Sequence, residues 1–157
     1  MLYELSQSAT AEPGFARPAR EMHRDAARVL RADNMIVVHY DERRPEFERV
    51  LRVVAGVPDP GSAPRRYPVG HGLMTPVVGE RCPIRTSNYT ETCRSLGVEP
   101  ALVPAGCPYW LGVPMIMAER VLGGLALWSA EAPFSEADEQ LLGSIANIAT
   151  LVLSIRP

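Results

Sequence analysis

The stretch from residue 109 to residue 129 places the strongest constraint on the fold of this chain. It contains two apolar runs of strand length, residues 109–117 and 121–129, and the only charged residues between them are Glu119 and Arg120. Two apolar strands joined by a short charged turn predict a β-hairpin.

Both faces of this hairpin are apolar. If the loop has two or four residues, odd positions of the first strand share a face with even positions of the second. Because neither face suits water, each needs a cover. Pro114 fits a bulge or an unpaired position, and Gly123-Gly124 would let a backbone or a ligand approach closely. The expected faces are Leu111, Val113, Met115 and Met117 beside Leu122, Gly124, Ala126 and Trp128, and Gly112, Pro114 and Ile116 beside Val121, Gly123, Leu125 and Leu127.

Composition indicates one globular domain and excludes several chemistries. The chain has 157 residues, of which 46% are hydrophobic and 22% charged. Its net charge of -2 gives no general attraction to nucleic acid or anionic lipid, so neither partner is expected. All 16 basic residues are arginine, which rules out a lysine nucleophile, a Schiff base and a phosphate-loop lysine.

The sequence contains neither a membrane-spanning or signal segment nor a recognisable cysteine motif, which bears on location and redox chemistry. No apolar run approaches the roughly 20 residues that span a bilayer, and the first residues lack the pattern of a signal peptide, so a cytoplasmic location is expected. Cys82, Cys93 and Cys107 are an odd number without a Cys-x-x-Cys pair or a neighbouring histidine. We therefore expect neither a zinc site nor a disulfide framework.

The chain divides into a tail, residues 1–17, and one domain, residues 18–157. From Pro18, an amphipathic helix ends near Asp33-Asn34; its apolar side carries Met22, Ala26, Val29 and Leu30. Residues 35–40 and 47–55 predict a second hairpin, whose second strand alternates apolar and polar residues.

The segment 56–108 contains nine of the 15 prolines, so it is expected to be loop with short inserts. Short helices are predicted at 73–78 and 88–96, with a strand at 82–86 between them. This segment is the expected cover for the second face of the sheet.

The last helix is predicted to begin after Ser135. Ser135 and Asp138 form a capping box, and Glu136 and Glu139 suit the positive end of the helix dipole. The apolar residues repeat at spacings of four and three, which predicts a heptad seam widened by Leu142, Ala149 and Leu153. One side of it can pack on the sheet while another meets a partner helix. The seam residues are Leu141, Ile145, Ile148, Val152 and Ile155.

The order of these features resembles the GAF domain family. The similarity covers roughly residues 18–155: the glycine turn Gly70-His71-Gly72, the strand near Ile84, the central hairpin and the capped last helix follow one another as in that family. This resemblance implies an α+β, PAS-like fold with a central antiparallel sheet of five or six strands. It also implies terminal helices on one face and a loop-covered small-molecule pocket on the other.

Such resemblance implies a regulatory sensor domain of a bacterial signalling protein, such as a two-component system, which signals through its terminal helices as a homodimer. Two alternatives are a free methionine-(R)-sulfoxide reductase that uses cysteine thiols and a ligand-free dimerisation module. No catalytic residue is assigned. The absence of lysine departs from the Asn-Lys-x-Asp motif of cyclic-nucleotide-binding members, and the cysteines and histidines do not match bilin or haem attachment, so no cofactor is expected. The candidate ligand-binding residues are His71, Arg85, Asn88, Tyr89, Cys93, Tyr109, Trp110 and Met115.

Overall fold

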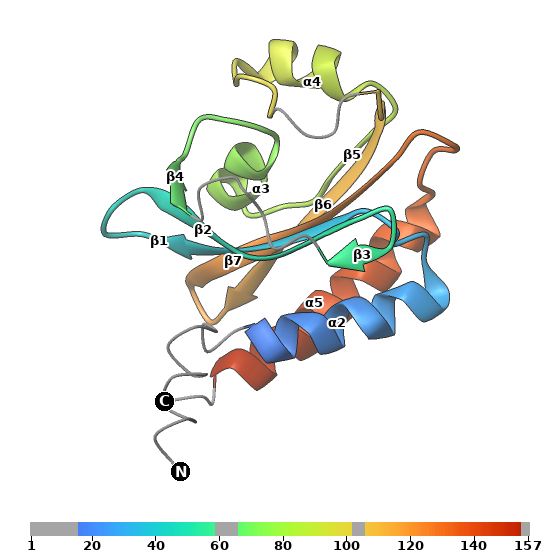
Figure 1. Cartoon of the computed structure of the whole chain (residues 1–157). Coiled ribbons are helices and arrows are strands. Elements are labelled where there is room, and N and C mark those ends of the chain that lie inside the picture. Colours follow the sequence, from blue (N-terminus) through green and yellow to red (C-terminus); the bar gives the residue numbers. More distant parts are fainter. Residues whose placement is uncertain (1–15, 59–65, 102–105, 155–157) are drawn as a thin grey trace.

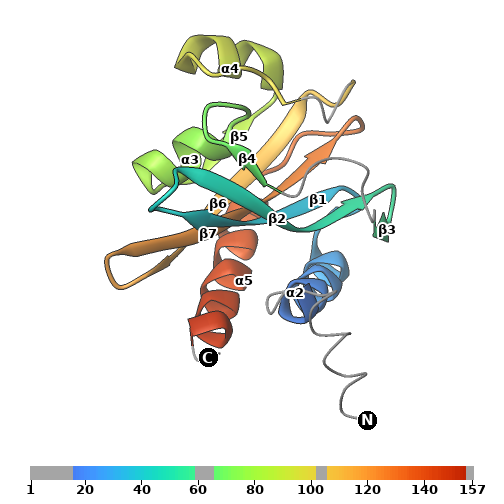
Figure 2. The same cartoon turned by 60° about the vertical axis from the view of Figure 1, so that its left-hand side comes forward.

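The computed structural model describes residues 16–58, 66–101 and 106–154 and has an α+β fold in three layers (Figure 1). One side of a central antiparallel sheet is covered by two long helices, α2 (Ala16–Val29) and α5 (Glu136–Ser154). The other side carries the shorter helices α3 (Met74–Glu80) and α4 (Tyr89–Leu96). A second view again places α2 and α5 together below the sheet (Figure 2). Both apolar faces of the central hairpin are therefore covered, as the sequence requires.

The sheet contains the five strands expected from the sequence and two short strands in addition. All of its ladders are antiparallel, and the order is β3-β2-β1-β7-β6-β5, with β4 also paired to β2. The predicted α+β class is confirmed. The strands are β1 (Met35–Asp41), β2 (Glu46–Val54), β3 (Val57–Pro58), β4 (Arg66–Pro68), β5 (Ile84–Thr86), β6 (Tyr109–Met117) and β7 (Arg120–Ser129).

The β6–β7 hairpin forms as predicted, but the predicted pairing of its faces was wrong for most of its length. Val113 lies opposite Leu125, not opposite Gly124 or Ala126, so odd positions share a face with odd positions. The cause is a bulge: the register shifts after Met115, and Leu122 is the extra residue. A bulge transfers every residue beyond it to the opposite face.

Gly123 makes this bulge possible. Its φ of +156° is a conformation that residues with a side chain rarely adopt. A Cβ atom at this position would lie 2.0 Å from the carbonyl oxygen of Val38 on the neighbouring strand β1. The absence of a side chain therefore allows β7 to approach β1 closely, which answers the question that the Gly123-Gly124 pair raised in the sequence.

A second bulge interrupts β2, where simple alternation was expected. Val37 pairs with Leu51 and Val38 with Arg49, so Val50 is the extra residue. Val50 and Leu51 both pack on the side of α2 and α5, and the residues on either side of them face the opposite way. Arg49 and Arg52, three residues apart, consequently lie on the same face of the sheet.

The long helices bury faces that differ in part from the predicted ones. On α2, Met22 and Ala26 are buried, but Val29 is 56% exposed and Ala19 takes its place in the core. The predicted tail boundary at residue 18 falls inside this helix, and residues 1–15 lie outside the described part of the chain. On α5, the residues that pack on the sheet are Leu142, Ala146 and Ala149.

The contact between α5 and the sheet therefore uses the residues that widen the predicted seam, Leu142 and Ala149, and not its central residues. Leu141 is 41% exposed and Ile148 is 64% exposed, while Ile145 is half-buried at the edge of the core. The side chains of Val152 and Ile155 lie outside the described residues. The seam and the buried stripe share the same spacing of four and three and lie one residue apart, about 100° around the helix, and the sheet covers the stripe at positions 142, 146 and 149.

The predictions of helix caps and short elements were more accurate than the predictions of which way side chains point. The capping box is present: the amide of Asp138 donates to Oγ of Ser135 at 3.1 Å, and the amide of Ser135 donates to Oδ2 of Asp138 at 2.8 Å. The inserts predicted in the proline-rich segment appear as α3, β5 and α4. None of the helices in the described ranges is long and apolar enough to cross a bilayer.

Replacement of Gly123 by alanine should lower the free energy of unfolding by about 3 kcal/mol, because the added Cβ meets a backbone oxygen in a strained conformation. Gly143→Ala is the matched control: it lies within α5 with open space around it, so it should raise the free energy of unfolding by up to about 1 kcal/mol. Urea denaturation of the two variants measures both values. Equal effects at the two positions would contradict the assigned role of Gly123.

Candidate functional site

A cavity of about 730 Å³ lies between the sheet and its short-helix cover. It is on the side opposite α2 and α5, where the sequence predicted a pocket. Its walls combine aromatic and aliphatic side chains with a few polar groups, a composition typical of small-molecule sites. The lining residues are Ile36, Arg49, Arg52, Tyr67, Pro68, His71, Gly72, Leu73, Met74, Tyr89, Glu99, Pro100, Ala101, Trp110 and Trp128.

The floor of the cavity owes its shape to small residues on the central strands. Ile36 of β1 pairs with Ala126 of β7, and Ala126 pairs with Gly112 of β6. The indole of Trp110 lies over Gly112, since a Cβ atom there would be 2.3 Å from the ring. The absence of a side chain at Gly112 therefore leaves room for the indole of Trp110 above the sheet.

Tyr89, the first residue of α4, joins the cover to the floor. Its ring lies 5.8 Å from that of Trp110, measured between centroids, and its hydroxyl accepts a hydrogen bond of 3.2 Å from the amide of Ala101. Burial raises the pKa of Tyr89 to about 12, and the Ala101 hydrogen bond opposes that rise. Gly72 makes room for this hydroxyl: a Cβ atom there would lie 3.1 Å from it. The glycine turn thus accommodates Tyr89.

The β2 side of the cavity is cationic. Arg49 is only 7% exposed, and its neighbour across the ladder, Val38, belongs to the apolar cluster on this face. Arg52 lies beside Ile36 and lines the same cavity. The Nη1 atom of Arg49 is buried and makes no hydrogen bond, while the side chain has other interactions. A guanidinium buried to this degree is unusual, because arginine keeps its charge in any environment.

Tyr67 of β4 stands next to these cations. Burial raises the pKa of its hydroxyl to about 12, and the charges of Arg49 and Arg52 oppose that rise. The hydroxyl is therefore protonated at neutral pH and can donate a hydrogen bond. The ring of Tyr67 packs on Phe47 with 5.6 Å between centroids, which holds it on the β2 side of the cavity.

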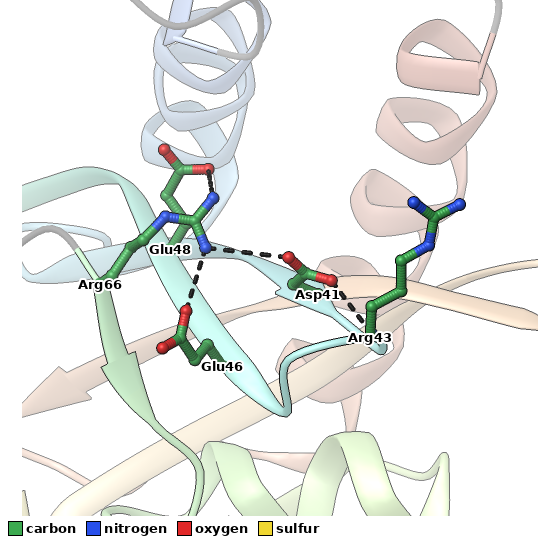
Figure 3. Close-up of polar contacts among 5 residues, drawn as sticks. All are labelled: Asp41, Arg43, Glu46, Glu48 and Arg66. Atoms are coloured by element: carbon green, nitrogen blue, oxygen red, sulfur yellow. Dashed lines mark hydrogen bonds and ion pairs between the residues drawn. The ribbon is translucent and has the colours of Figure 1, made fainter.

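The strand that carries Tyr67 is held by an ion-pair network (Figure 3). The guanidinium of Arg66 lies 3.1 Å from Glu46, 3.7 Å from Glu48 and 3.8 Å from Asp41. Arg43 adds only its backbone amide, which donates to Asp41 at 3.0 Å. Because three carboxylates from β1 and β2 share one cation, the network fixes the short strand β4 at the wall of the cavity more firmly than a single exposed pair would.

The rim of the cavity is formed where two loop segments meet. His71 and Glu99 form a parallel β-bridge, in which the amide of Gly72 donates to the carbonyl of Glu99 at 2.6 Å. The amide of Glu99 in turn donates to the carbonyl of Gly70 at 3.1 Å. Both side chains are exposed. Backbone hydrogen bonds therefore hold the rim and leave these two side chains available to a bound molecule.

Three of the eight candidate residues from the sequence line this cavity: His71, Tyr89 and Trp110. Trp110 faces the cavity and Tyr109 packs toward the helices, as expected for successive residues of a strand. The sequence did not say which of the two would face the pocket. Met115 belongs to the core beneath α2 and α5, on the opposite face from the cavity.

The other three candidates have structural contacts outside this cavity. Arg85 donates to Glu139 of α5 at 3.0 Å and to the carbonyl of Phe134 at 3.4 Å. Asn88 caps α4, since its Oδ1 accepts from the amide of Glu91 at 3.1 Å. Cys93 is fully buried in the cluster that supports Tyr89. We assign no direct ligand contact to them.

Sequence reasoning missed the most polar part of the site. Arg49, Arg52 and Tyr67 are not among the candidates from the sequence, and a strict alternation would place Arg49 and Arg52 on opposite faces of the strand. A signal was present: Val50-Leu51, two adjacent apolar residues between two arginines, break the alternation. Such a break is the pattern that a β-bulge leaves in a sequence.

The cysteines do not meet in this site. The thiols of Cys82, Cys93 and Cys107 are free, and none is among the residues that line the cavity. Burial raises the pKa of the Cys93 and Cys107 thiols, which lowers the thiolate fraction at neutral pH. Among the described residues, no group of three or more histidine, cysteine or acidic side chains could hold a metal ion.

The family model for the GAF domain matches residues 19–154. The chain belongs to the GAF domain family. A comparison with curated proteins gave no significant match.

Solved structures show the same fold at low sequence identity. The GAF domain/HD domain protein from Geobacter sulfurreducens matches with a TM-score of 0.68 and 18% identity, over 90% of this chain and 92% of that one. The GAF domain of a phosphoenolpyruvate-protein phosphotransferase from Coxiella burnetii matches with a TM-score of 0.68 and 20% identity, over 98% and 90%.

A free methionine-R-sulfoxide reductase from Neisseria meningitidis, solved with its substrate, also matches. Its TM-score is 0.65 at 17% identity, over 87% of this chain and 78% of that one. The GAF fold thus occurs both as a domain of larger proteins and in a free methionine-R-sulfoxide reductase, so the fold alone does not assign a function to this chain.

The thiols of this GAF domain should differ in reactivity in a way that follows their exposure. Cys82 is exposed and should react rapidly with Ellman's reagent at neutral pH, whereas buried Cys93 should react only when the protein unfolds. Cys82→Ser should remove the fast phase without changing the slow one. A fast phase that survives in Cys82→Ser and disappears in Cys93→Ser would instead indicate a reactive thiol beside Tyr89.

Proposed function

We propose that this GAF domain is a regulatory sensor that binds a small molecule in the cavity between its sheet and its α3–α4 cover. The observation that carries the proposal is a cavity of about 730 Å³ with two tryptophans, two tyrosines and two arginines in its walls. Cavities of roughly 300–1,000 Å³ with mainly apolar walls and a few polar groups are typical ligand sites.

The proposed setting is a bacterial signalling protein in the cytoplasm. Support comes from the structural neighbours, which include GAF-B of DevS from Mycobacterium smegmatis and a methyl-accepting chemotaxis protein. Sulfoxide reduction remains an alternative because two neighbours are reductases. The geometry gives it less support, since no cysteine lines the cavity.

A change in the cover can reach the long helices through β5. This strand follows α3 along the chain, precedes α4, and pairs with β6. Its Arg85 donates both to Glu139 on α5 and to the carbonyl of Phe134 just before α5. In this proposal a ligand selects one of two positions of the cover, and Arg85 passes the difference to the first turns of α5.

The exposed side chains of α5 favour homodimerisation as part of the same proposal. Leu141 and Ile148 lie seven residues apart, and both expose apolar surface that the sheet does not cover. Two residues at this spacing occupy equivalent positions on a helix face. A dimer through the long helices would bury Leu141 and Ile148 and would bring the α5 helices of two protomers together. If the domain binds no ligand, this contact alone would make it a dimerisation module.

A ligand search can use the protein's own reporters. Both tryptophans are nearly buried and line the cavity, so a bound molecule should change their emission as well as raise the melting temperature in a metabolite screen. A ligand at 100 times its Kd adds about 2.7 kcal/mol to the free energy of unfolding.

Ala101→Trp, at the rim, should weaken any such binding at least tenfold, whereas Ala130→Trp, on the exposed turn after β7, should not. A collection of metabolites that produces no shift in either signal would count against the sensor function.

The dimer has a separate test. Ile148→Glu should shift the protein from dimer to monomer in light scattering, because a charge cannot be buried at a helix contact. Asn147→Glu, an exposed neighbour on the same helix, is the matched control and should leave the mass unchanged. If the protein without substitutions is a monomer at high micromolar concentration, the proposed dimer is refuted, and the proposed ligand binding is not affected.

A further inference from the structure

We propose that Asn34 is a positioning residue that connects the floor of the cavity to the end of α2, so that a change at Trp128 reaches the two long helices. This inference rests on the proposed sensor function and adds a second route of transmission, separate from the contact of Arg85. It follows from the hydrogen bonds of residues 30–34, the segment that joins α2 to β1.

Asn34 forms two hydrogen bonds with the backbone of Trp128. The amide of Trp128 donates to the carbonyl of Asn34 at 3.3 Å, and Nδ2 of Asn34 donates to the carbonyl of Trp128 at 3.2 Å. The paired residues of β1 and β7 end at Met35 and Leu127, so these bonds extend the ladder by one pair, with a side chain as one of the donors. Because the indole of Trp128 lines the cavity, Asn34 is bonded directly to the backbone of the cavity floor.

The same side chain is also bonded to a strained turn. Oδ1 of Asn34 accepts from the amide of Ala55 at 3.0 Å, and the carbonyl of Asp33 accepts from the amide of Gly56 at 2.8 Å. Ala55 has a φ of +53°, in the left-handed region, and such a conformation persists where the surrounding structure fixes it. Both polar atoms of the Asn34 side chain are therefore engaged, one on β7 and one in the β2–β3 turn.

The neighbouring residues connect Asn34 to both long helices. Nε2 of His23, in the middle of α2, forms a hydrogen bond of 2.8 Å with the carbonyl of Ala32. Nη1 of Arg31 donates to the carbonyl of Ala132 at 3.2 Å, and its guanidinium lies 5.8 Å from the centre of the Phe134 ring, just before α5 begins. Residues 30–34 thus contact the cavity floor, α2 and the start of α5.

The two routes reach the same end of the helix pair. The end of α2 lies beside the start of α5 (Figure 1), and the Arg85 contact also acts on the first turns of α5. The Arg85 route begins at the cover of the cavity, whereas the Asn34 route begins at its floor. A molecule that displaces the indole of Trp128 shifts its backbone, and the hydrogen bonds of Asn34 pass this shift to residues 30–34 and to the last turn of α2 without a movement of α3 or α4.

Hydrogen exchange of the Leu30 amide reports on the end of α2, because this amide donates to the carbonyl of Ala26 at 2.8 Å. Trp128→Phe reshapes the cavity floor and should change the exchange rate of Leu30 in the full chain about fivefold or more, as measured by NMR. Trp110→Phe is the matched control: Trp110 pairs with Trp128 and lines the same cavity, but it belongs to β6 and should change the rate less than about twofold. Leu125, at the centre of the sheet, is followed in the same spectra to detect a change in global stability.

Asn34→Asp tests the link itself, because it keeps the acceptor for Ala55 and removes the donor to Trp128. In this background Trp128→Phe should no longer change the exchange of Leu30. A merely structural role of Asn34 would alter the rate by a constant factor and leave the effect of Trp128→Phe intact. Asn34→Ala serves if Asn34→Asp does not fold, as judged by near-ultraviolet circular dichroism.

Asn88→Asp is the control for this substitution, because the side chain of Asn88 also accepts a backbone amide and aspartate can replace it as a helix cap. In the Asn88→Asp background, the effect of Trp128→Phe on Leu30 should be retained.

Three results would overturn the inference. They are equal effects of the two tryptophan substitutions at Leu30, a change at Leu30 that is no larger than the change at Leu125, and an effect of Trp128→Phe that persists with Asn34→Asp. These measurements need no ligand, so their failure leaves the sensor function standing if the metabolite screen finds a ligand. If the screen finds none and the exchange pattern is as expected, the sensor function fails and the connection through Asn34 stands.

Discussion

Burial of both faces of the β6–β7 hairpin is the constraint on which the rest of this structure depends. The two strands lie at the centre of the sheet, and neither side carries the polar residues that would suit water. One face is covered by long helices with complementary apolar surfaces, which leave little space. The other is covered by short helices and loops rich in proline, which cannot match the sheet along its whole length, and the cavity lies beneath them. The site is thus a consequence of unequal covers.

The sequence predicted which elements exist more reliably than which way their side chains face. Helix caps, hairpins and proline-rich inserts are local, and the Ser135 capping box or the turn after β1 can be recognised from a few adjacent residues. The face of the sheet to which a side chain points depends on the register of the strand, and one extra residue reverses that face for the residues beyond it. The bulges at Val50 and Leu122 therefore account for the two largest errors, the pairing of the central hairpin and the omission of Arg49 and Arg52 from the site.

The helix α5 illustrates a different limit. Its apolar residues form two adjacent stripes of the same four-and-three spacing, one at positions 141, 145 and 148 and the other at 142, 146 and 149, and only the position of the sheet decides which is buried. In the structure Leu142, Ala146 and Ala149 turn inward, and this choice leaves Leu141 and Ile148 at the surface. Of the candidate site, Tyr89, Trp110 and His71 could be found because they stand at a helix start, a strand start and a glycine turn, respectively. Arg49 and Arg52 could not be found in this way, because their position depends on how β2 pairs with β1.

The extra residue in β2 has an evolutionary consequence. Deleting this residue would turn Arg49 toward the helices and leave Arg52 on the cavity side, while the strand, its ladder with β1 and the helices around it could all persist. The chemistry of the cavity wall in such a domain can therefore diverge through a change of length at one strand position as well as through substitution. This offers a physical route by which GAF domains can keep one architecture, as the neighbours of 14–21% identity to this chain do, while the polarity of the cavity wall changes.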